Sequence, residues 1–156
     1  DEPQLSMRDP GEFLKIVETV KKLRGEFEEL ANAKIMTIFL RGQDFWHIDK
    51  LDVVGVDDYD QKSESLTIGE HARLVKQLSP GQKTILVPGA GYFTNPDPWV
   101  AYALLNPEQV EVVAPFLWFD DPNHKDENFT GLEAQSAENQ QRWRNAGLTL
   151  RGVPGY

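Results

Sequence analysis

The chain has 156 residues, no cysteine, and a formal net charge of -9 from 25 acidic and 16 basic residues. This length is typical of one domain and is short for a complete eight-stranded α/β barrel, which needs ~250 residues. The lack of thiols excludes disulfides, thiolate catalysis and Cys-ligated zinc, and the acidic balance disfavours nucleic-acid or anionic-membrane partners because phosphate binding needs a basic surface.

Residues 10–32 have the pattern of an amphipathic helix that opens at Asp9 and Pro10. Gly25 weakens the later part of this stretch, so one bent helix or two helices fit it equally. Apolar side chains recur along it at spacings of three and four, namely Phe13, Ile16, Val17, Val20, Leu23, Phe27 and Leu30.

Four apolar runs follow, at residues 35–40, 51–56, 83–87 and 110–119, and helical stretches separate them. Continuous β-branched and aromatic runs indicate buried parallel strands, and the repeat of roughly 30 residues is that of a βαβ unit. The sequence therefore predicts a single α/β domain over residues 1–156, with parallel strands alternating with helices in βα units over residues 34–150. Six side chains should be buried in adjacent strands: Val53, Val56, Ile85, Val87, Val112 and Phe116.

The helices between and after these runs have recognisable boundary signals. Thr67 and Glu70 have the spacing of a capping box, which predicts a helix beginning at Thr67. A last helix is expected over residues 132–145. Gly147 would then end it as a C-cap glycine, and residues 148–150 would form a final short strand.

Three segments carry a family resemblance. Leu51-Asp52-Val53-Val54-Gly55-Val56-Asp57-Asp58-Tyr59 resembles a strand end common in glycoside hydrolases built on the (β/α)8 barrel, an apolar strand with a central glycine that closes on Asp-x-Tyr. Lys83-Thr84-Ile85-Leu86-Val87-Pro88-Gly89 is similar to the strand that follows in those proteins, and Val113-Ala114-Pro115-Phe116-Leu117-Trp118-Phe119 is similar to their late aromatic strand. The likeness covers roughly residues 35–150 and implies the C-terminal half of such a barrel, with a carbohydrate ligand.

The sequence departs from that family at the strand ends. Many of its members place a glutamate acid/base after one strand and a glutamate nucleophile after another, whereas the strand ends here carry aspartates. The resemblance therefore implies catalytic aspartates, a half-missing site or an inactive one. An open flavodoxin-like sheet is the alternative fold. Four strands cannot close a barrel, so the two outer strands of the sheet would each leave an unpaired edge. We expect these edges to be covered by the first helix and the tails, by a second copy in a homodimer, or by further strands of a larger protein.

The best chemical candidates are the aspartates at the predicted strand ends. Glycoside hydrolysis needs two carboxyl groups, which lie ~5–5.5 Å apart in enzymes that retain the anomeric configuration and ~6.5–9.5 Å apart in enzymes that invert it. Clustering of carboxyl groups raises the pKa of at least one of them, which suits a general acid. Asp58 and Asp60 would point to one side of an extended strand and Asp57 to the other. We expect Asp58, Asp60 and Asp120 to be catalytic and Asp57 to contact substrate. A solvated turn or a Ca²⁺ site are the alternatives.

Aromatic side chains near the same strand ends could stack on sugar rings. The expected substrate-binding residues are Trp46, Tyr59, Tyr92 and Trp118, with His124 as a polar contact on the loop over residues 120–130. Core packing is the alternative for each aromatic. The G-x-G of residues 89–91 lacks the third glycine of a dinucleotide fingerprint and the lysine of a P-loop, so no cofactor is expected, and no metal site is assigned.

These residues together predict a glycoside-hydrolase-like, carbohydrate-active protein that cleaves a glycosidic bond with strand-end aspartates. The alternative is a non-catalytic sugar-binding or assembly module that keeps the aromatics without a working carboxylate pair. We expect no nucleic-acid partner and no membrane partner, because no run approaches the ~20 apolar residues of a membrane span. A sequon at Asn128 is compatible with secretion or a periplasmic location but is common by chance.

Overall fold

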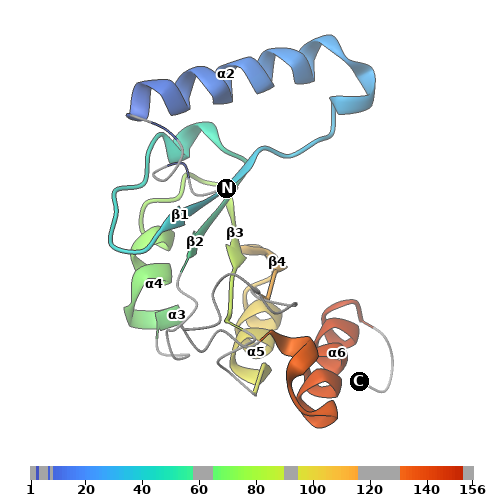
Figure 1. Ribbon diagram of the computed structural model, residues 1–156. Coiled ribbons are helices and arrows are strands. Elements are labelled where there is room, and N and C mark those ends of the chain that lie inside the picture. Colours follow the sequence, from blue (N-terminus) through green and yellow to red (C-terminus); the bar gives the residue numbers. More distant parts are fainter. Residues whose placement is uncertain are drawn as a thin grey trace.

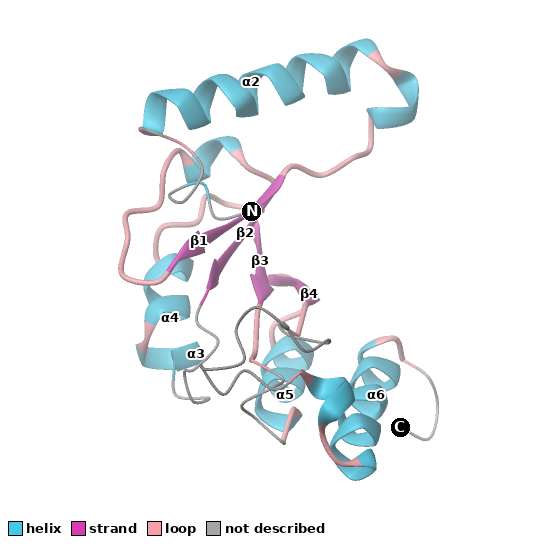
Figure 2. Cartoon of the chain, viewed as in Figure 1, coloured by secondary structure: helices cyan, strands magenta, loops and turns pink. Residues whose placement is uncertain are grey.

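The computed structural model describes residues 3, 7, 9–57, 65–89, 95–115 and 131–152. Within them, four strands form one parallel sheet in the order β1-β2-β3-β4 (Figures 1 and 2). The α/β class is therefore confirmed. Each strand lies beside its neighbour in sequence, as in the wall of a barrel, and this order differs from the flavodoxin order 2-1-3-4-5. The strands are β1 (Met36–Leu40), β2 (Val53–Asp57), β3 (Lys83–Leu86) and β4 (Val110–Val113).

Helices separate β2 from β3 and β3 from β4, whereas β1 and β2 are joined through a short 3-10 turn. Figure 1 shows α2 on the β1 side of the molecule, and α5 and α6 together on the β4 side. The start of α2 matches the prediction, because Asp9 caps it by accepting a hydrogen bond from the Glu12 N–H at 3.0 Å. The helices are α2 (Pro10–Glu26), α3 (Ser65–Ile68), α4 (Glu70–Val75), α5 (Asp97–Leu105) and α6 (Ala137–Leu150), with 3-10 turns η1 (Glu28–Leu30), η2 (Ile48–Lys50) and η4 (Leu132–Ala134).

Helices cover one face of the sheet, and their buried side chains form two separate apolar clusters. Phe39 of β1 lies beside Val56 of β2, and Phe13 of α2 packs edge-on against Phe39 with ring centroids 5.8 Å apart. Leu74 of α4 belongs to the same buried cluster. A second cluster joins β3 and β4 to α5 through Leu86, Val110 and Trp99. Thus α2 and α4 cover β1 and β2, whereas α5 covers β3 and β4.

The inner strands β2 and β3 are buried on both faces, which explains their continuous apolar sequences. The expected burial of Val53, Val56 and Ile85 is confirmed. The expected burial of Val112 is wrong, because its side chain is 44% exposed on β4, which pairs only with β3 in the described part of the chain. Val87 follows β3 and is half-buried, and Phe116 lies outside the described residues.

Several predicted boundaries are wrong. Helix α6 continues through Gly147 to Leu150, so residues 148–150 form no strand. Trp143 is buried, and Leu150 packs against the α5 cluster. This packing outweighs the ~1 kcal/mol cost of a glycine inside a helix. Thr67 lies within α3, and Gly69 stands at the N-cap of α4, so Thr67 and Glu70 form no capping box.

Candidate functional site

The strands end together at one edge of the sheet, here called the carboxyl edge. Leu40, the last residue of β1, pairs in register with Asp57, the last residue of β2, and Leu86 of β3 pairs with Val113 of β4. Asp57 is half-buried there. The chain leaves this edge after β2, β3 and β4 into the three segments that carry the other candidate aspartates and aromatics. This is the edge at which α/β folds bind ligands.

Most of the predicted site residues lie outside the described residues. Of the predicted set, the structure places Asp57 and Trp46, and the convergence of the others on one pocket stays a prediction. The residues concerned are Asp58, Tyr59, Asp60, Tyr92, Trp118, Asp120 and His124.

Trp46 belongs to an aromatic cluster on the helix-covered face of β1. Its ring centroid lies 6.4 Å from that of Phe13, with the planes tilted by 55°, and the side chain is half-buried. Phe45, the preceding residue, packs in turn on Phe39 at 5.6 Å. These contacts are those of core packing, so an additional contact with sugar stays a prediction for Trp46.

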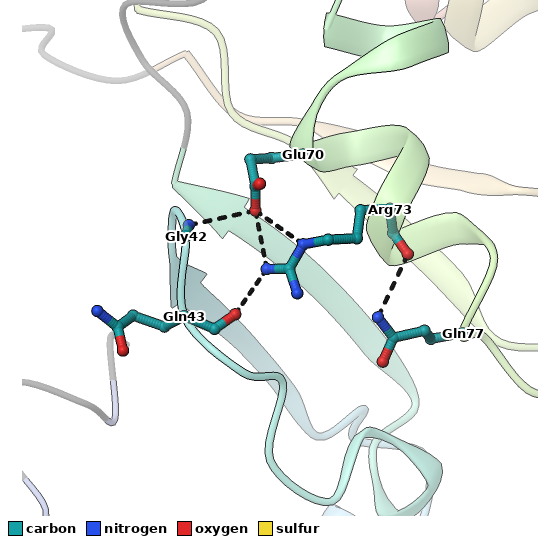
Figure 3. Close-up of polar contacts among 5 residues, drawn as sticks. All are labelled: Gly42, Gln43, Glu70, Arg73 and Gln77. Carbon is teal, nitrogen blue, oxygen red and sulfur yellow. Dashed lines mark hydrogen bonds and ion pairs between the residues drawn. The ribbon is translucent and has the colours of Figure 1, made fainter.

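A polar cluster that the sequence did not reveal joins the loop after β1 to α4 (Figure 3). Glu70 Oε2 accepts hydrogen bonds from Arg73 Nη2 at 2.8 Å, Arg73 Nε at 3.1 Å and the Gly42 N–H at 3.2 Å. Arg73 Nη2 also donates to the Gln43 carbonyl oxygen at 2.6 Å, and its guanidinium lies 4.0 Å from the ring centroid of Phe45. We call these residues the loop clamp.

The loop clamp holds the loop after β1 against α4. Its carboxylate oxygen accepts three hydrogen bonds, two from Arg73 and one from Gly42, so Glu70 is committed to these partners, which does not suit a general acid. The spacing of three between Glu70 and Arg73 could have revealed that pair from the sequence. The contact with Gly42 could not have been found this way, because it joins residues 28 positions apart.

His71, the next residue of α4, is the most perturbed titratable group in the described part of the chain. Its side chain is 4% exposed, and its Nε2 atom has no hydrogen-bond partner among the described residues. The ring meets Tyr102 edge-on at 5.4 Å and lines a cavity of about 20 Å³ with Val56 and Trp99 among its walls. Burial lowers the pKa of His71 to about 4, so the imidazole is neutral at pH 7. The cavity has room for one water molecule.

No group of three or more His, Asp or Glu side chains in the described ranges is arranged to hold a metal ion. None of the helices described is both long enough and apolar enough to cross a membrane.

Comparisons with protein-family models, with curated proteins and with solved structures find no match for this chain. The resemblance of three strand segments to glycoside hydrolases therefore rests on the sequence alone.

Proposed function

We propose that this chain is a carbohydrate-active protein of the glycoside-hydrolase type, with its sugar site at the carboxyl edge of the sheet. The observation that supports the proposal is the sequential parallel order of the strands, which puts Asp57 at the edge from which all the candidate segments depart. The loop clamp adds support, because a loop held rigidly beside that edge is suited to orienting a ligand.

In the hydrolytic form of this proposal, Asp58 is the general acid and Asp60 or Asp120 is the second carboxylate. Glu70 is unsuited to replace either, because Arg73 and Gly42 already bind its Oε2 atom. Tyr59, Tyr92 and Trp118 supply flat faces for stacking on sugar rings, and the acidic surface of the protein does not repel a neutral glycan.

Release of reducing ends from a panel of polysaccharides tests hydrolysis. Asp58→Asn should lower turnover by at least ~10²-fold, the scale of a lost general acid, while leaving the fold intact. Asp49→Asn is the matched control, because Asp49 is exposed in η2, before β2 begins, and should leave turnover unchanged. Equal activity in Asp58→Asn and the wild type would contradict the assignment of Asp58.

A non-catalytic sugar-binding module is the second candidate. It is favoured by the engagement of Glu70 in the loop clamp, since a glutamate is the usual acid/base in the families that the sequence resembles. In that case no glycan is cleaved, and calorimetric titration with oligosaccharides should show binding that Trp118→Ala weakens and Asp58→Asn largely preserves. A protein that neither cleaves nor binds any glycan of the panel would overturn both candidates.

A further inference from the structure

An apolar stripe on α2 has no partner among the described residues. Its side chains follow one another at spacings of 4, 3 and 4, up to the residue that ends the helix, and this is the pattern of a coiled-coil seam. Phe13 and Val17 lie beside this stripe and are buried against the sheet, so α2 uses one flank for its own domain and leaves the seam open. Figure 1 shows α2 at the periphery of the molecule. The stripe consists of Ile16, Val20, Leu23 and Phe27, each between 40% and 47% exposed.

We propose that this stripe is the interface of a homodimer in which α2 pairs antiparallel with α2 of a second copy. The stripe is self-complementary in this orientation. A two-fold axis midway between residues 21 and 22 sets Ile16 of one copy against Phe27 of the other, and Val20 against Leu23. Such pairing of unlike seam positions is what an isologous contact between two copies requires.

The charges beside the stripe favour the antiparallel orientation. Lys15 and Glu26 lie on the same exposed flank of α2, Lys15 in the first half of the helix and Glu26 at its end. Antiparallel pairing sets this flank against the same flank of the other copy and brings Lys15 near Glu26, whereas parallel pairing sets it against the opposite flank. Lys22 lies near the two-fold axis and is 3.7 Å from Glu26 of its own helix, which moderates the repulsion between the two lysines.

The exposed apolar area fits a dimer that forms and dissociates. A fully exposed side chain of these types presents roughly 150–200 Å², so four of them at this exposure offer roughly 250–350 Å² per copy. Two copies together would bury about 500–700 Å² of apolar surface, and the flanking charged side chains raise the total toward the ~1,000 Å² of a specific interface. A patch of this size on one helix is larger than scattered surface residues produce.

Sedimentation velocity over a dilution series of the intact chain tests the interface. The wild type should shift from the 17.7 kDa monomer toward the dimer as concentration rises. Leu23→Glu should weaken the dimer at least ~10-fold, because two copies of a central side chain are lost. Leu105→Glu is the matched control, since Leu105 is 80% exposed on α5 and should leave the dimer unchanged.

Two results would overturn the proposal. A wild type that stays monomeric at every concentration would show that something other than a second copy covers the stripe. A Leu23→Glu variant that dimerises like the wild type, with unchanged helical circular dichroism, would place the interface elsewhere.

Cysteine cross-linking tests the orientation, because the chain has no native cysteine. A mixture of Val20→Cys and Leu23→Cys chains should give a cross-linked heterodimer on mild oxidation, with little cross-linking of either variant alone. Preferential self-cross-linking of Val20→Cys would indicate parallel helices and contradict the antiparallel arrangement.

Discussion

Mild acid should destabilise this protein through His71. The unfolded chain binds a proton on this ring near its ordinary pKa of 6.5, whereas burial lowers the pKa in the folded protein to about 4. The contribution of the neutral ring to stability is therefore fully present above pH 6.5 and is lost as the pH falls toward 4. The complete shift is worth about 3 kcal/mol, of which about 2 kcal/mol should be lost by about pH 5. That is a large fraction of the ~5–15 kcal/mol that stabilises a typical domain.

Urea denaturation at about pH 7.5 and about pH 5 measures this loss. His71→Phe removes the titrating group while keeping an aromatic ring beside Tyr102, so its stability should vary by about 2 kcal/mol less over the same interval. Asp52 and Glu111 should remain charged over this interval, because the pKa of each carboxyl lies below its ordinary value.

A direct titration of the ring keeps the test independent of whether His71→Phe folds. The proton signals of the His71 imidazole in the folded wild type should stay at their neutral positions down to about pH 5. An imidazole that titrates near 6.5 in the folded protein, or a His71→Phe variant with the pH dependence of the wild type, would refute the reasoning.

Two glycines and the loop clamp provide further tests. Gly55→Ala should lower the urea midpoint, with a loss of ~1–3 kcal/mol, because the new Cβ would lie 3.2 Å from Ile38 Cγ1. Gly147→Ala should raise the melting temperature, with a gain of ~0.5–1 kcal/mol, since nothing lies within 4 Å of a Cβ at this position inside α6. Glu70→Gln should speed amide hydrogen exchange at Gly42 by about five-fold, the effect of losing ~1 kcal/mol of local stability. Unchanged exchange at Gly42 would mean that the clamp does not restrain the loop.

The apolar runs of the sequence located the strands well. The runs predicted at residues 51–56 and 83–87 match β2 and β3 closely, because a strand buried on both faces carries apolar side chains at nearly every position. The apolar run that begins at residue 110 was a poorer guide to the extent of its strand. Strand β4 ends at Val113, and its exposed positions include Glu111 and Val112, because an edge strand keeps part of its surface in water.

The candidate site could be anticipated only in part. The position of Asp57 at the end of β2 followed directly from the local pattern, and the structure places it at the carboxyl edge. The contact of the loop clamp with Gly42 and the burial of His71 did not follow from any pattern. Glu70 resembled a capping residue in the sequence, whereas in the fold its carboxylate holds Gly42, which lies on the neighbouring βα unit.

The sequence by itself indicated the segments that become the four strands and most of the helices, because apolar runs and the period of 3.6 depend on residues a few positions apart. Tertiary structure decided the order of the strands, the continuation of α6 through Gly147, the environment of His71 and the exposure of the stripe on α2. Each of these depends on which distant segments pack together, and the free energy of that packing is summed over the whole core. A local preference of ~1 kcal/mol, such as that against a glycine within a helix, is overridden when the buried contacts that it opposes are worth more.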